Sequence, residues 1–447
     1  CIRNEFILEN PDHSVSYSKF SQLKPKSTKA TQHNKLKTCR CEYCMKVELR
    51  LKGINKFLAL KGFCQLTLAN KDAALDMTLC ARTKAFHQSN CVERKCGSCG
   101  VTALSAHFQP VLVDHGESPA TWEIWSNVTE EYRQNDGTLR STKKWKPVAK
   151  ERPFKDLVSE LEDEMKTFSL HLFQARWQHY QFSQVKDNLP DNWLVLVSDF
   201  GQNFTCHHQD EIQGAHWCRS EATIHPTVAY YKKEGKVVRH SFVFISNDLK
   251  HDAHAVHHFQ MKVTNKLLSE GLSFVRKIHF SDGCASQYKG KTNIVDLSHA
   301  EEDTGILTEL HYFGSRHGKG PCDAEIGVVK KSANLAIKRR AAVMSDARSM
   351  YLWAQGSLTR DSDVSKRTFF FVPQGEINRE REERSGKDNK SLPGTKTLHA
   401  LRSQALYVVT WRKRSCFCPP CRNMEGTCDN MTCGPWHVFN MQKRRGE

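Results

Sequence analysis

The chain has 447 residues, more than one compact domain usually holds, so we expect two or three domains. Its 66 lysines and arginines outnumber 49 acidic residues, and the net charge of +17 favours an acidic partner, either nucleic acid or an anionic membrane. No apolar stretch of 18 residues occurs, which argues against transmembrane helices, and no apolar segment near the start suggests a secretory signal. Because the chain begins with Cys1 rather than Met, we interpret it as processed or as part of a longer protein.

The first 190 residues are predicted to hold three segments. Residues 1–38 are polar and lysine-rich without an apolar period, which is typical of a mobile basic tail or the remnant of a domain. Residues 39–115 form a cysteine-rich module. Residues 116–190 are predicted to contain a hairpin or basic connector and then one long helix over 154–186, where apolar residues recur every three or four positions.

The cysteines of the first module have the spacing of zinc ligands. Two thiolates separated by two residues can hold one tetrahedral ion, and a second pair closes the site. We therefore predict that Cys41 and Cys44 share one zinc ion with Cys96 and Cys99. Enough residues remain for a second zinc site, and we predict Cys39 and Cys91 as ligands. The other residues left over in this module are Cys64, Cys80 and His87. The alternative is reduced structural thiols or, in an extracellular protein, disulfides.

Residues 191–360 alternate strands and helices. An apolar run at 193–197 is typical of a buried strand, and two β-rich runs joined at 232–235 predict a hairpin. Helices are predicted over 254–268, 285–297 and about 323–342, separated by strands over 274–280 and 306–313. The order β-β-β-α-β-α-β-α predicts an α/β domain with a mixed sheet.

The remaining chain is predicted to be a charged linker and strand over 361–415, followed by a second cysteine-rich module over 416–447. We interpret the alternating charges of 376–384 as a solvated helix face. Six residues of the last module could supply the four ligands of a zinc ion, with reduced thiols or disulfides again the alternative: Cys416, Cys418, Cys421, Cys428, Cys433 and His437.

Three acidic residues fall at the ends of predicted strands. Asp199 ends the first strand, Asp282 ends the fourth, and Asp323 opens the helix after the fifth. Strand carboxyl ends are where open α/β sheets place their sites. Two or three carboxylates suffice for Mg²⁺ or Mn²⁺, and a pair of such ions can stabilise the attacking and leaving oxygens of a phosphoryl displacement. Glu325 is an alternative third acid.

Two strings around these acids carry a family resemblance. Residues 281–289 read Ser-Asp-Gly-Cys-Ala-Ser-Gln-Tyr-Lys, and residues 317–323 read His-Gly-Lys-Gly-Pro-Cys-Asp. They resemble proteins encoded by eukaryotic cut-and-paste transposons, and the order of strands and acids over about 190–345 resembles the ribonuclease H-like fold of DDE-type transposases. The Ser-Cys-Phe-Cys-Pro-Pro-Cys string at 415–421 is similar to theirs too. Many DDE enzymes have Glu as third acid, whereas the second string here favours Asp323, followed by Ala324 in place of the family's glycine.

The resemblance implies a transposase or transposase-derived protein in the nucleus, which cleaves and transfers DNA strands with catalytic Mg²⁺ or Mn²⁺. Its partners would be transposon ends and target DNA, with no membrane, and we expect a homo-oligomer. Arg316 and Lys319 could contact scissile-strand phosphates, although the glycines around Lys319 could equally form a plain flexible turn. His317 and Lys289 are further candidates for nucleic-acid binding.

Two other hypotheses remain open. The same fold could survive in a host-adopted protein that binds DNA but no longer cuts it, and such a protein would show salt-dependent binding without metal-dependent cleavage. A zinc-stabilised scaffold for protein interactions is the third hypothesis, and it would lack a positive channel.

Overall fold

The computed structural model describes residues 16, 19, 41–82, 85–133, 137–318, 320–381, 384, 389–424, 428 and 431–442, without the side chains of residues 215, 216 and 431. The chain divides into two units, Cys1–Cys41 and Glu42–Glu447. Most of the predicted basic tail over 1–38 lies outside the described residues, as does Cys39. No helix in the described part of the chain combines the length and the apolar character needed to span a membrane.

The second unit begins with short helices and a hairpin. The helices are α3 (Glu42–Leu60), η1 (Cys64–Leu66), α4 (Lys71–Met77), α5 (Ser89–Val92) and α6 (Ala103–His115). Strands β1 (Pro119–Arg133) and β2 (Leu139–Pro153) then pair antiparallel along their whole length, which confirms the predicted hairpin.

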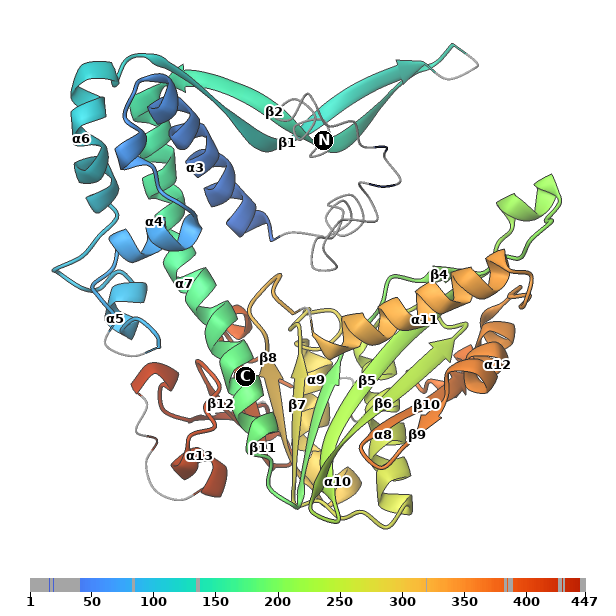
Figure 1. The fold of residues 1–447 in the computed structure, drawn as a ribbon. Helices are drawn as coiled ribbons and strands as arrows, with labels where there is room; N and C mark the ends of the chain where they lie inside the picture. The colour runs from blue at the N-terminus through green and yellow to red at the C-terminus, as the bar shows by residue number, and fades with distance from the viewer. Residues whose placement is uncertain are drawn as a thin grey trace. The chain divides into compact units, whose positions relative to one another are not determined.

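The long helix α7 (Phe154–Asp187) confirms the prediction made from apolar spacing. Leu157, Leu161 and Met165 recur on its buried side because residues three or four apart share a helix face. Its first half packs against α3 and α6, whereas Phe182 and Val185 near its end join the core of the large sheet (Figure 1). One helix therefore connects the N-terminal helices to the sheet.

The large sheet is mixed, as predicted. Its central strands are β3 (Trp193–Ser198), β5 (Glu221–Lys233), β6 (Lys236–Ser246), β7 (Arg276–Ser281) and β8 (Leu307–Tyr312). β3, β5 and β6 pair antiparallel in turn, and β3, β7 and β8 pair parallel. The outer strands are β4 (Phe204–Thr205), β9 (Arg360–Asp361), β10 (Ser365–Val372), β11 (Ala400–Ala405), β12 (Val408–Arg412) and β13 (His437–Asn440). The full order is β13-β12-β11-β8-β7-β3-β5-β6-β10-β9, with β4 beside β5.

Helices cover both faces of this sheet (Figure 1). Successive side chains of a strand point to opposite faces. Leu194 and Leu196 of β3 accordingly pack with α8 (Ala253–Ser269), whereas Val195 and Val197 pack with the end of α7. Helices α11 (Pro321–Lys338) and α12 (Ala347–Leu358) cover β5, β6 and β10 on the α7 side. The other helical segments are η2 (Gln213–Trp217), α9 (Lys291–Ser298), α10 (Ala300–Thr304), η3 (Gln374–Glu376), η5 (Thr395–Thr397), α13 (Pro419–Asn423) and η6 (Met431–Cys433).

Some predicted elements differ in extent. The helix expected over 285–297 begins only at Lys291, because residues 284–290 form a turn in which the Tyr288 amide donates to the Cys284 carbonyl at 2.8 Å. The predicted charged linker contains β10, which pairs parallel with β6 and buries Phe369 and Val372. The linker is therefore partly a core strand of the sheet.

The interpretation of 376–384 as a solvated helix face is wrong. Within its described residues the segment forms no α-helix, and its arginines meet acids from distant elements. Arg379 pairs with Asp248 at 2.6 Å, and Arg381 pairs with Asp296 at 2.6 Å. The alternation of charge therefore reflects long-range ion pairs, which a local pattern does not reveal.

Gly314, in the segment after β8, packs directly against the backbone of α7. A Cβ atom at Gly314 would lie 2.6 Å from Cα of Ala175 in α7, so the backbones are too close for any side chain. We expect Gly314→Ala to lower the free energy of unfolding by about 1–3 kcal/mol, measured by denaturant titration. Gly375→Ala is the control, because nothing lies within 4 Å of its Cβ position. Equal unfolding midpoints for the two variants would contradict this packing.

Candidate functional site

Asp199, Asp282 and Asp323 lie at one edge of the sheet. Asp199 follows β3 and Asp282 follows β7, and these two strands are parallel neighbours whose carboxyl ends therefore meet. Asp323 lies in the first turn of α11, where its Oδ2 accepts a hydrogen bond from the Gly320 amide at 2.9 Å. Oδ1 of Asp282 accepts one from the Cys284 amide, also at 2.9 Å. Local backbone bonds thus fix two of the three carboxylates.

The three carboxylates influence one another's charge. Burial and then the negative charges of Asp282 and Asp323 raise the pKa of Asp199 to about 7. Burial also raises the pKa of Asp282, against the opposing effect of backbone hydrogen bonds. Since the interaction of carboxylates falls with distance, Asp282 and Asp323 both lie near Asp199. The three acids are nevertheless not among the groups of described residues whose ligand atoms all lie within 4.8 Å of one another.

Buried acids elsewhere in the chain are matched by arginines. Glu325 is 3% exposed and accepts hydrogen bonds from Arg239 at 2.6 Å and Arg367 at 2.8 Å. Burial acts to raise the pKa of Glu325, but the two guanidinium groups outweigh it and lower the pKa. Asp199, Asp282 and Asp323 form no ion pair with any lysine or arginine among the described residues. Within the described part of the chain, these acids therefore differ from Glu325 in having no basic partner.

Glu325 is placed unlike the other predicted acids. Two residues beyond Asp323 on α11, its side chain leaves a different face of the helix. Its carboxylate is occupied by the arginines of β6 and β10. The geometry therefore leaves Asp323 as the third acid of the group.

The predicted nucleic-acid contacts have different surroundings. Lys289 is buried, donates to the Leu398 carbonyl at 2.6 Å, and has its pKa lowered to about 8 by burial, so its prediction as a DNA contact is wrong. Arg316 is half-exposed and forms an ion pair with Glu42. Lys319 lies outside the described residues. His317 belongs to a cysteine–histidine group.

Three groups of cysteine and histidine residues place all their ligand atoms within 4.8 Å of one another. The first cluster is Cys41, Cys44, His171 and His317; the second cluster is Cys80, Cys91, Cys96 and Cys99; the third cluster is Cys416, Cys418, Cys421 and Cys428.

The separations within the clusters fit zinc. A tetrahedral zinc ion with sulfur ligands at about 2.3 Å implies sulfur–sulfur distances of about 3.8 Å. The Sγ atoms of Cys80 and Cys96 lie 3.8 Å apart, as do those of Cys418 and Cys428. A disulfide would need about 2.05 Å, and none of the described cysteines forms one. All three clusters are therefore compatible with structural zinc.

The predicted sharing of one zinc ion by Cys41, Cys44, Cys96 and Cys99 is wrong, because the two pairs lie in different clusters. Histidines complete the first pair, and Cys80 with Cys91 completes the second. His171 and His317 were missed, since His317 lies 273 residues from Cys44 in sequence and no local spacing marks the pair.

Two predicted ligands of the last module lie outside the third cluster. The buried Cys433 donates to the Ser415 carbonyl at 3.4 Å, and the ring of His437 stacks on Trp411 with centroids 4.5 Å apart. The four grouped cysteines already complete a tetrahedral set.

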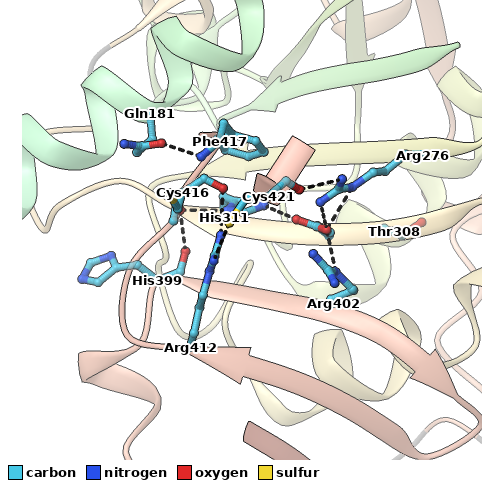
Figure 2. Close-up of polar contacts among 12 residues, drawn as sticks. Gln181, Arg276, Thr308, His311, His399, Arg402, Arg412, Cys416, Phe417 and Cys421 are labelled. Atoms are coloured by element: carbon cyan, nitrogen blue, oxygen red, sulfur yellow. Dashed lines mark hydrogen bonds and ion pairs between the residues drawn. The ribbon is translucent and has the colours of Figure 1, made fainter. Parts of the chain in front are cut away.

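A buried polar network fastens the third cluster to the sheet (Figure 2). Arg412 donates to Sγ of Cys421 at 3.4 Å and to the Cys416 carbonyl at 2.8 Å. Arg276 of β7 donates to the Cys421 carbonyl at 3.3 Å and to the Glu309 carboxylate at 3.0 Å. Such outer hydrogen bonds orient metal ligands, so β7 and β12 set the geometry of this cluster.

Comparison with known proteins identifies a family. Residues 178–415 match the family model described as "Domain of unknown function (DUF8701)", which spans more than half of the chain. The chain belongs to the DUF8701 family. The DUF8701 range holds the three acids and ends one residue before the third cluster begins.

The other comparisons add little to this DUF8701 protein. No curated protein matches it. Two solved structures are similar at 11% identity. "Crystal structure of NurA bound to dAMP and manganese" aligns over 28% of this chain and 30% of that chain with a TM-score of 0.10. "Crystal structure of NurA" aligns over 56% of this chain and 50% of that chain with a TM-score of 0.11. The chain thus spans half or less of either structure's length, and these TM-scores carry no argument.

The raised pKa of Asp199 makes the stability of the metal-free protein depend on pH. Asp199 binds its proton more tightly when folded than in the unfolded chain, where the ordinary value is 3.8, so folding loses stability as pH rises from about 4 to about 7. We expect Asp199→Asn to raise the free energy of unfolding by at most about 4 kcal/mol at pH 8, and by less at lower pH. Denaturant titrations at pH 5 and pH 8 measure the change, with the exposed Asp163→Asn as control. An equal gain in the free energy of unfolding at pH 5 and pH 8 would contradict the raised pKa of Asp199.

Zinc in the third cluster can be tested by removing one ligand. We expect Cys421→Ser to lose one zinc equivalent per chain, measured by elemental analysis. Its unfolding free energy should fall by about 3 kcal/mol when free zinc exceeds its dissociation constant a hundredfold. Cys218→Ser, at an exposed cysteine outside the clusters, should keep the zinc content and stability of the unaltered protein. Equal zinc contents in the two variants would rule this site out.

Proposed function

We propose that this DUF8701 protein is a DDE-type transposase, or a protein derived from one, that cleaves and transfers DNA strands. Asp199, Asp282 and Asp323 would hold two Mg²⁺ or Mn²⁺ ions. The observation that carries the proposal is the placement of three acids at one edge of the sheet, after the parallel neighbours β3 and β7 and in the first turn of α11, with no described arginine or lysine paired to them.

The order of elements supports a ribonuclease H-like fold for this domain. Apart from the two-residue β4, β3, β5, β6, β7 and β8 follow one another in the chain, and pairing of the first of these five with the fourth brings the ends that precede Asp199 and Asp282 together. Asp323 follows on the helix after the fifth strand. These are the positions that the resemblance to DDE-type transposases implies for the three acids.

The residues present fit hard divalent cations, which prefer carboxylate oxygens and keep several waters. Two such ions supply Lewis-acid stabilisation of the attacking and leaving oxygens of a phosphodiester. Burial and the two neighbouring carboxylates raise the pKa of Asp199 to about 7 in the metal-free protein, and a bound cation would favour its ionised form. Gly318 packs on Asp282 so closely that a Cβ atom would lie 2.9 Å from the Asp282 side chain, so a residue without a side chain fits best at this position.

The rest of the chain suits a DNA partner. The net charge of +17 would favour binding to a polyanion. Arg316, half-exposed in the segment before Asp323, remains a candidate contact for phosphates. The three clusters would hold structural zinc, and the protein would act as a homo-oligomer in the nucleus on transposon ends and target DNA.

Cleavage of DNA carrying the element's terminal repeats tests the proposal. With Mg²⁺ or Mn²⁺ at pH 8, we expect the unaltered protein to nick such DNA and Asp282→Asn to lose about a thousandfold or more of the rate, because a metal ligand is replaced by a neutral amide. Asp163→Asn, an exposed carboxylate on α7 that pairs only with its neighbour Lys166 in the described structure, should retain full activity. Cleavage by Asp282→Asn at the unaltered rate would refute the role of the acids.

A further inference from the structure

We infer that the first cluster binds a zinc ion that holds the segment between β8 and α11 in place, and that this ion thereby controls cation binding at Asp282 and Asp323. The second half of the inference rests on the proposed function, whereas the zinc site and its hold on the segment do not. The cluster differs from the other two in joining three distant parts of the chain.

The ligands come from two helices and a loop. Cys44 lies in the first turn of α3, His171 lies midway along α7, and His317 lies between β8 and α11. Nε2 of His317 lies 3.6 Å from Sγ of Cys44 and 3.1 Å from Nε2 of His171. Cys41, three residues before Cys44, completes the set of four.

The 3.6 Å separation of Cys44 and His317 matches one tetrahedral ion, and the 3.1 Å separation of His171 and His317 is slightly short of it. Zinc–nitrogen bonds of about 2.0–2.1 Å and zinc–sulfur bonds of about 2.3 Å imply ligand separations of about 3.3–3.8 Å. The Nε2 atoms of His171 and His317 face each other beside the Cys44 thiol, as ligands of one cation would. Two cysteines with two histidines are a usual structural zinc set.

The ligand His317 is directly connected to the acids. Gly318, the next residue, lies against Asp282, since a Cβ atom there would come within 2.9 Å of the Asp282 Cβ. The Gly320 amide donates to the Asp323 carboxylate, and α11 begins at Pro321. Gly318 and Gly320, just after His317, therefore contact two of the three acids.

The same helices supply further anchors to this segment. Nε2 of His179 in α7 donates a hydrogen bond to the His317 carbonyl at 2.5 Å. Glu42 in α3 forms an ion pair with Arg316. The Arg316 pair is half-exposed, and exposed pairs contribute about 0–1 kcal/mol. Zinc is thus the strongest tie available to hold the segment against the acids.

Loss of this zinc should therefore make the position of the Asp323 carboxylate less fixed, although the residue itself is unchanged. Removing an outer support of a metal ligand typically costs about 10–100-fold in metal affinity. We expect Cys44→Ser to lose one zinc equivalent, to bind Mn²⁺ about 10–100-fold more weakly, and to exchange backbone amide hydrogens faster over 314–320. Elemental analysis, electron paramagnetic resonance titration with Mn²⁺ and hydrogen-exchange mass spectrometry measure these three effects.

Cys64→Ser is the matched control, because Cys64 is exposed on η1 and belongs to no cluster. Unchanged zinc content in Cys44→Ser would overturn the site. Lost zinc with unchanged exchange over 314–320 would overturn its hold on the segment. If the unaltered protein binds no Mn²⁺, the proposed function fails, while zinc content and exchange still decide the rest.

A second pair of variants covers the case in which Cys44→Ser does not fold. His317→Ala removes a ligand and should lose one zinc equivalent, whereas His317→Cys keeps a ligand and should retain both the zinc and the slow exchange. Equal zinc contents in these two variants would overturn the inference.

Discussion

The burial of Asp199 close to the carboxylates of Asp282 and Asp323 is the constraint that sets this edge of the sheet apart. Burial first, and then the nearby negative charges of Asp282 and Asp323, raise the pKa of Asp199, so an ionised Asp199 costs free energy in the metal-free site. Glu309 and Glu325 show that this chain matches buried acids with arginines where it needs only stability. The acids at the sheet edge, which no described arginine or lysine pairs with, are therefore the group for which we propose an external cation.

Helix α7 holds the surroundings of that group together. Ser169 donates to the Val92 carbonyl beside the second cluster, and Trp177 donates to the Ser415 carbonyl beside the third. His171 belongs to the first cluster. The end of the same helix packs on β3 and β7, the strands that lead to Asp199 and Asp282. A single rigid helix thus links all three clusters to the strands that carry two of the acids.

Local patterns in the sequence predicted much of this architecture. The apolar period of α7, the β5–β6 hairpin and the acids at strand ends were visible because each depends on neighbouring residues. The partners of Arg379 and Arg381 and the pairing of Cys44 with His317 were not, since tertiary packing alone brings these residues together. Cys-x-x-Cys spacing correctly marked thiols that converge, but spacing contains no information about which second pair completes a site.

The most direct measurement is a crystal structure of the protein soaked in Mn²⁺ at pH 8, with the metal located by anomalous scattering. The account predicts two peaks about 3.5–4 Å apart, coordinated by Asp199, Asp282 and Asp323. Density that shows these three carboxylates without any bound metal would contradict it.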